Sequence, residues 1–272
     1  MSTHFSKIEV LGCSGGIGVI GEGTTCFLVD EDVLIDAGTG MLRLPLERLE
    51  KIRHVIVTHS HLDHICGIPL MIDSVSRANS EPLQIHALPE TIQALRDHMF
   101  NGVIWPDFSR IPSIEKPAIQ YVELDCQDEQ PHAFKIGERL FTAIPVHHSV
   151  PSIGLTVETP TGAWAFSGDT HKTEEFYKII NLMKGMRHVL VEAAFPDHEL
   201  WLADLSLHLC PSLLAIELEK LIPQAEVWIT HLKPNEKALI EKEIKSYCDP
   251  DGLKPTIQQA LGFLKTGQVF EV

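Results

Sequence analysis

The chain has 272 residues, of which 22 are Lys or Arg and 37 are Asp or Glu, so its formal charge is −15 with histidine neutral. Hydrophobic residues make up 44% and charged residues 22%, a composition that excludes an intrinsically disordered chain. The negative charge argues against a general nucleic-acid or anionic-membrane footprint. Fifteen histidines stand out among the counts and direct the search toward metal ligands.

The sequence carries no signal for a membrane or a secretory pathway. There is no run of 18 apolar residues, and the first residues lack the apolar core of a signal peptide. The six cysteines are scattered and form no CxxC pair, which favours reduced thiols. We therefore expect a cytoplasmic protein without a membrane partner.

Periodicity predicts alternating strands and helices along the chain. Short apolar runs predict strands at Lys7–Leu11, Thr25–Val29, Asp32–Ile35, His54–Val57, Leu140–Val146, Leu155–Glu158, Ala163–Phe166, His188–Val191, Val227–Ile229 and Gln268–Val272. Helical spacing predicts helices at Leu42–Lys51, Thr91–Met99, Glu174–Met183, Pro211–Leu221 and Glu236–Ser246. Asn101–Pro131 holds four prolines and little periodicity, which indicates a surface insertion. The absence of a low-complexity linker favours one α/β domain over residues 1–272.

The densest chemical signal follows the strand predicted at His54–Val57. It is the run His59-Ser-His61-Leu-Asp63-His64, four metal-competent side chains in six positions. Imidazole and carboxylate groups are the ligands of zinc and related metals. Residues two apart on an extended chain share a side, so His59 and His61 can converge on one ion. A turn after them lets Asp63 and His64 face a second ion.

Further ligands are expected where other predicted strands end. His147 or His148, Asp169 and His231 each follow an apolar run. The carboxyl ends of strands in an open α/β sheet lie at one edge, so these side chains can meet the His59–His64 run there. The residues alone leave open which of the two adjacent histidines is the ligand.

The order of these motifs resembles the metallo-β-lactamase superfamily. The matching segments are His59-x-His61-x-Asp63-His64, a later histidine after a strand, Ser167-Gly-Asp169-Thr170 and Thr230-His231. The resemblance implies a four-layer αββα sandwich with a two-metal site at its edge. It assigns one ion to His59, His61 and His148, the other to Asp63, His64 and His231, and a bridging role to Asp169.

Within that superfamily, four segments look like class II 3',5'-cyclic-nucleotide phosphodiesterases. They are His61–Ile68, Val191–Pro196, Leu207–Pro211 and Ile229–Pro234, although Pro69 stands where that family has an aliphatic residue. The spacing from His148 to Gly154 also looks like that branch and favours His148. His147 would then face the other side of its strand, as a core histidine or one that supports a ligand.

The resemblance to the phosphodiesterase branch implies a chemistry. Two divalent ions, zinc by preference with manganese or iron as alternatives, would bridge a hydroxide that attacks a small anionic phosphodiester such as cyclic AMP and forms AMP. Asp63 would be essential for turnover as well as a ligand. His208 would be the general acid, oriented by Glu192. The alternative is that Glu192 and His208 only cap neighbouring helices.

Two other activities fit the same fold. A tRNA 3'-end processing endonuclease shares the later motifs, but Asn101–Pro131 contains two basic residues against six acidic ones, which disfavours nucleic acid. A mononuclear-iron oxidoreductase often lacks ligands of the second site, whereas this chain keeps Asp63, His64 and His231. The sequence also leaves open whether the chain forms a homodimer.

Overall fold

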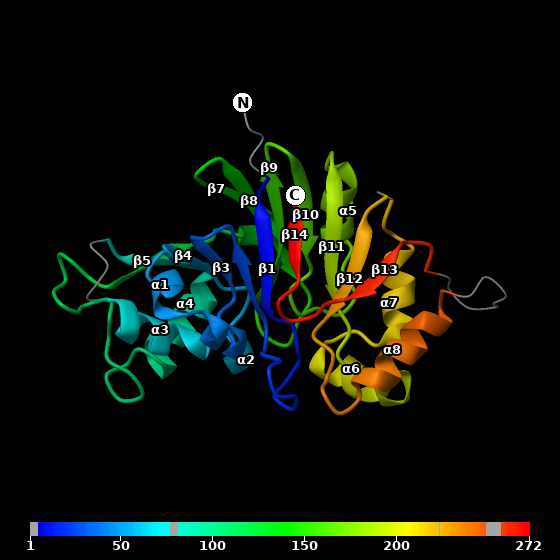
Figure 1. Cartoon of the computed structure of the whole chain (residues 1–272), viewed down its shortest axis with the longest axis horizontal. Coiled ribbons are helices and arrows are strands. Elements are labelled where there is room, and N and C mark those ends of the chain that lie inside the picture. Colours follow the sequence, from blue (N-terminus) through cyan, green and yellow to red (C-terminus); the bar gives the residue numbers. More distant parts are fainter. Residues whose placement is uncertain (1–4, 77–80, 223, 249–256) are drawn as a thin grey trace.

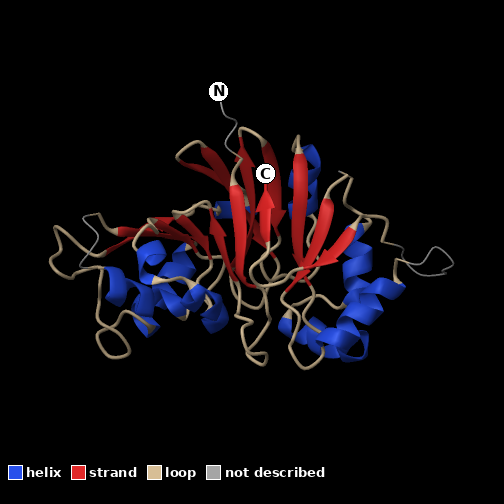
Figure 2. Cartoon of the chain, in the orientation of Figure 1, coloured by secondary structure: helices blue, strands red, loops and turns tan. Residues whose placement is uncertain are grey.

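The computed structural model describes residues 5–76, 81–222, 224–248 and 257–272. Within these residues the strands form two seven-stranded sheets that pack face to face, and helices cover the outer faces (Figures 1 and 2). This arrangement confirms the four-layer αββα sandwich expected from the sequence.

The two sheets have the same mixed construction. In spatial order the first contains β14 (Val269–Glu271), β1 (Lys7–Gly12), β2 (Cys26–Val29), β3 (Val33–Ile35), β4 (His54–Ile56), β5 (Leu83–Ala87) and β6 (Ile119–Glu123). The second contains β13 (Leu261–Phe263), β12 (Glu226–Thr230), β11 (Met186–Glu192), β10 (Gly162–Phe166), β9 (Ser152–Thr159), β8 (Arg139–Val146) and β7 (His132–Ile136). Strands β3 to β6 and β10 to β13 run parallel, and the others pair antiparallel.

The helices lie outside the sheets. On the side of the first sheet are η1 (Thr39–Arg43), α1 (Leu46–Leu49), α2 (Leu62–Ile65), α3 (Gly67–Val75) and α4 (Pro89–His98). On the side of the second sheet are α5 (Glu175–Leu182), η3 (Asp197–Glu199), α6 (Leu200–Ser206), α7 (Pro211–Leu218) and α8 (Lys237–Ser246). A short η2 (Gln127–Glu129) precedes β7.

Alternation of side chains along the strands produces three apolar layers. In β2, Phe27 and Val29 face the space between the sheets, whereas Leu28 packs with the helices that cover the first sheet. The Phe27 ring meets the Phe166 ring of the second sheet edge to face, with centroids 5.0 Å apart. This central layer fixes one sheet on the other and aligns the strand ends that carry the site.

The structure corrects two of the predicted elements. The helix expected over Leu42–Lys51 is limited to η1 and the single turn α1, because Pro45 between them has no backbone N–H to donate within a helix. The segment 101–131 is not wholly an insertion, since β6 lies inside it and pairs parallel with β5.

Among the described residues no single helix is long and apolar enough to cross a membrane. The helices Asp197–Ser206 and Pro211–Leu218 reach that length and apolar content only as a pair, and the pair is bent by 74°.

Candidate metal centre

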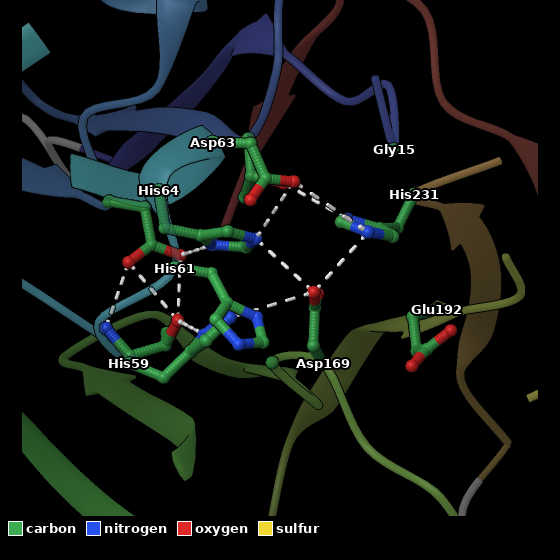
Figure 3. Close-up of polar contacts among 12 residues, drawn as sticks. Gly15, His59, His61, Asp63, His64, Asp169, Glu192 and His231 are labelled. Carbon is green, nitrogen blue, oxygen red and sulfur yellow. Dashed lines mark hydrogen bonds and ion pairs between the residues drawn. The ribbon is translucent and has the colours of Figure 1, made fainter. Parts of the chain in front are cut away.

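Seven side chains that the sequence singled out meet at the carboxyl ends of β4, β8, β10 and β12 (Figure 3). They form overlapping groups in which the ligand-type atoms lie within 4.8 Å of one another. Three of these groups are His59, His61 and His148; His59, His64 and Asp169; and Asp63, His64 and His231. The structure therefore brings the predicted set together at one edge of the sandwich.

Asp169 lies between the groups. Its Oδ2 atom is 3.2 Å from Nε2 of both His64 and His231, and 3.8 Å from Nε2 of His59. On the far side of His64, Oδ2 of Asp63 is 3.8 Å from the Nε2 atom of His64 and 4.0 Å from that of His231. This position suits a carboxylate that is shared between two ions.

Hydrogen bonds behind the histidines set the tautomers of two rings. Nδ1 of His64 lies 2.7 Å from the Asp36 carboxylate and donates to it. The Thr58 hydroxyl donates to the same carboxylate at 2.9 Å, so it accepts from Nδ1 of His59 at 3.0 Å. Both rings therefore direct their other nitrogen, Nε2, toward Asp169.

Three atoms at the centre have no hydrogen-bond partner among the described residues. They are Nε2 of His59, Nε2 of His64 and Oδ1 of Asp169, and all three are buried. Buried polar atoms without a partner are costly, and the lone pair of the neutral His59 ring, aimed at a carboxylate, repels it. A cation among them would remove both penalties, so the residues fit the divalent ions that the fold implies.

The electrostatics of the site also favour a positive charge. Burial lowers the pKa of His59 well below its usual value and that of His231 to about 3, which keeps both rings neutral as ligands must be. At His64 burial opposes protonation, but Asp169 and Asp36 prevail and raise its pKa well above the usual value. The carboxylates that draw a proton to His64 would equally attract a metal ion.

A buried acid–base pair adjoins the cluster. Oε1 of Glu192 accepts from the Thr170 amide at 2.9 Å and from Nδ1 of His208 at 2.7 Å, and Oε2 accepts from the Leu209 amide at 3.3 Å. Burial works against a charged His208, yet Glu192 raises its pKa. The His208 ring centroid lies 4.8 Å from that of His148. His208 also forms a ligand-type group with His148 and Asp169.

The structure distinguishes the two adjacent histidines. His148 is buried within the cluster, and its Nδ1 atom bonds the Leu207 carbonyl at 2.9 Å. The His147 side chain is exposed, so the expectation that it lies in the core is wrong. Its backbone carbonyl instead accepts from the His171 amide at 2.7 Å and holds the segment after Asp169.

Sequence reasoning missed several supporting groups. Asp36 also follows an apolar strand, so the strand-end rule that found Asp169 could have found it. It and His231 have positive φ angles of 55° and 63°, backbone strain that concentrates at functional sites. Asp204 on α6 bonds His171 at 3.0 Å, a contact between distant segments that no local pattern signals.

A family model described as a beta-lactamase superfamily domain matches residues 31–237. The chain belongs to the beta-lactamase superfamily. This membership agrees with the metallo-β-lactamase fold of the two sheets and their covering helices.

Curated relatives lie in two branches of the superfamily. The chain is 41% identical over 64 residues to 3',5'-cyclic-nucleotide phosphodiesterase 1 of Saccharomyces cerevisiae, a match of 23% of this chain and 17% of that enzyme. The matched part thus spans less than a fifth of that relative. It is 23% identical over 288 residues to a probable 3',5'-cyclic-nucleotide phosphodiesterase of Yersinia pestis, covering 86% of this chain and 80% of the relative. It is 31% identical over 134 residues to ribonuclease Z of Staphylococcus carnosus, covering 47% of this chain and 39% of the relative.

Solved structures share the whole fold. Unliganded yeast PDE1 superposes with a TM-score of 0.78 at 19% identity, covering 98% of this chain and 99% of that one. The metallo-beta-lactamase fold protein YhfI from Bacillus subtilis superposes with a TM-score of 0.75 at 18% identity over the same shares. At these identities the likeness concerns the fold alone.

Proposed function

We propose that the chain is a dinuclear metal-dependent phosphodiesterase that hydrolyses a small phosphodiester, with a 3',5'-cyclic nucleotide such as cyclic AMP as the favoured substrate. One observation carries the proposal. Asp169 lies between two groups of ligand-type side chains, and a buried Glu192–His208 pair lies beside them. The phosphodiesterase relatives, one of which matches 86% of this chain, support the choice of substrate.

The seven residues would hold two divalent cations, most readily zinc given the histidine-rich ligand set, with manganese or iron as alternatives. One set would be His59, His61 and His148; the other would be Asp63, His64 and His231; Asp169 would contribute to both. Such ions lower the pKa of water toward neutrality and neutralise charge on a phosphate.

The chain's own groups would handle the leaving oxygen. Hydrolysis breaks the bond between phosphorus and the 3' oxygen, and that oxygen needs a proton as it leaves. His208 would donate the proton from Nε2, because its Nδ1 proton is held by Glu192 at 2.7 Å. The backbone amides of Thr170 and Leu209 fix Glu192 in place, so the pair is oriented before substrate binds.

The ribonuclease Z relatives support a second candidate, a tRNA 3'-end processing endonuclease. The charge on the segment expected to contact RNA speaks against it. Two exposed basic side chains, Arg110 and Lys116, stand there against five exposed acidic ones. The acidic residues are Glu115, Glu123, Asp125, Asp128 and Glu129. A polyanion would be repelled at that surface.

The test is turnover by the zinc- or manganese-loaded protein of bis(p-nitrophenyl) phosphate, 3',5'-cyclic AMP and a tRNA precursor, with metal content measured in the same samples. We expect about two metal ions per chain and cleavage of the two small diesters. Asp63→Ala and His64→Ala should abolish turnover and leave the circular dichroism spectrum unchanged. Cleavage of the tRNA precursor alone, or near-native activity in both variants, would overturn the proposal.

A further inference from the structure

Large apolar side chains are exposed on three segments that surround the metal centre. We call this set the apolar rim. Exposed fractions are 82% for Ile17, 46% for Val19, 104% for Ile20, 67% for Leu62, 65% for Trp201 and 72% for Leu205. Ile17 to Ile20 form the tip of the β1–β2 loop, Leu62 begins α2, and the last two lie on α6. Figure 1 shows these three segments along the lower edge of the molecule.

Each segment is tied to the ligand cluster by direct contacts. In the β1–β2 loop the Cys13 carbonyl accepts from the His231 amide at 2.8 Å, and Gly15 lies against His231 (Figure 3). Leu62 stands between His61 and Asp63 in the sequence. On the third side, the Leu207 carbonyl just after α6 accepts from Nδ1 of His148 at 2.9 Å. The rim therefore belongs to the loops that build the centre.

The cations nearest the loop are already engaged. Nζ of Lys233 donates to the Gly15 carbonyl at 2.6 Å, and Nζ of Lys237 pairs with Glu22 at 2.7 Å. With a net charge of −15, the surface offers little attraction to an extended polyanion. Contact with apolar surface is a source of binding free energy that needs no free cation, at about 25 cal/mol per Å².

We propose that the apolar rim binds the organic group of a phosphodiester, so that the enzyme prefers aromatic or apolar esters over small alkyl esters of the same charge. The exposed Trp201 ring offers a face on which an aromatic ring can stack, and the exposed Ile17 and Ile20 side chains offer aliphatic surface on the β1–β2 loop. A nucleobase has this chemistry. The inference rests on the proposed function and narrows its substrate class.

The test compares bis(p-nitrophenyl) phosphate with methyl p-nitrophenyl phosphate, which share charge and leaving group and differ only in the retained ester. The variant is the Ile17→Ser, Ile20→Ser double substitution. The matched control is Leu182→Ser, at an 85% exposed residue. Leu182 ends α5, which connects the parallel strands β10 and β11 and therefore ends at the edge of the sheet opposite the site. Intrinsic reactivity of each ester cancels when variants are compared.

We expect the double substitution to lower kcat/KM for the diaryl ester about tenfold and to leave the methyl ester within twofold. Leu182→Ser should change neither. Equal losses on both esters, or no loss on either, would overturn the inference. Sedimentation of the same proteins tests whether the rim binds a second copy of the chain instead. A native dimer that the double substitution dissociates would make the rim a dimer interface and overturn the inference.

A binding measurement tests this inference independently of the proposed function. Calorimetry of the metal-loaded protein with diphenyl phosphate and dimethyl phosphate needs no turnover. Tighter binding of diphenyl phosphate that is lost in the double variant would support the rim even if no diester were hydrolysed. Hydrolysis without such a preference would sustain the proposed function and refute the rim.

Discussion

Nδ1 of His64 lies 2.7 Å from Oδ2 of Asp36, and neither side chain has any exposed surface. Asp36 also accepts from the amide and hydroxyl of Thr58, and that hydroxyl in turn bonds His59. One buried carboxylate thus orients a histidine from each of the two ligand groups.

Asp36→Asn should weaken metal binding while keeping all seven proposed ligands. The amide cannot accept from His64 and Thr58 as the carboxylate does, so both ring orientations lose their support. We expect metal affinity to fall about 10–100-fold, measured by competition with a chelator. Asp73→Asn, a change at an exposed residue of α3, is the control and should bind metal as the native chain does. Unchanged affinity in Asp36→Asn would refute this orienting role.

Gly15→Ala should disturb the centre, whereas Gly16→Ala should not. A Cβ atom on Gly15 would lie 2.2 Å from the backbone oxygen of His231, which forces the loop or that ligand to move. At Gly16 the nearest atom would be 3.4 Å away, on Pro234. Metal content and thermal unfolding of the two variants test this. The expectation fails if Gly15→Ala retains both metal ions and the native melting temperature.

The sequence predicted the side chains that the structure brings together at the site, because the signals that identify them are local. His59, His61, Asp63 and His64 are close in the chain, and Asp169 and His231 each follow a recognisable apolar strand. The same rule could not separate His147 from His148, because the chain turns after β8 ends at Val146 and a two-residue period no longer fixes the side.

The two predicted elements that the structure corrects were wrong for different physical reasons. The helix predicted over Leu42–Lys51 ignored Pro45, a signal that was present in the sequence. Strand β6 had no such signal, since it is an edge strand with an exposed Gln120 and a half-buried Tyr121, so its apolar alternation is weak. What makes it a strand is pairing with β5, a contact that periodicity alone does not reveal.

His208→Gln should affect substrates according to their leaving group. An alkoxide leaving from cyclic AMP needs a proton, whereas p-nitrophenolate leaves without one. We expect kcat for cyclic AMP to fall about 10²–10⁴-fold and kcat for bis(p-nitrophenyl) phosphate to fall much less. Glu192→Gln should show the same pattern, and His198→Gln, at an exposed position in η3, should show neither loss.

The metal content of the His208→Gln variant distinguishes a proton donor from a metal ligand. A proton donor can be replaced without loss of metal, so the variant should bind as many ions as the native chain. Loss of metal, together with equal losses on both substrates, would make His208 a ligand beside His148 and Asp169 instead.

The buried His86 and its half-buried neighbour His54 should make the protein less stable in acid. Nδ1 of His54 lies 3.0 Å from Nε2 of His86, whose ring stacks on Phe134. Burial, together with a smaller effect of the neighbouring His54, lowers the pKa of His86 to about 4. Between pH 6.5 and about 4 the unfolded chain therefore binds a proton that the folded chain does not, so stability rises with pH in this window.

His86→Phe should flatten that dependence, because the aromatic ring keeps the contact with Phe134 and removes the titrating group. Between pH 7.5 and 4.5 we expect the native chain to lose about 2 kcal/mol more unfolding free energy than the variant. Urea denaturation of metal-free protein measures the difference without a contribution from the metal centre. His98→Phe, at an exposed position ending α4, is the control and should keep the native slope. Equal slopes in the native chain and His86→Phe would show that His86 is not the group that titrates.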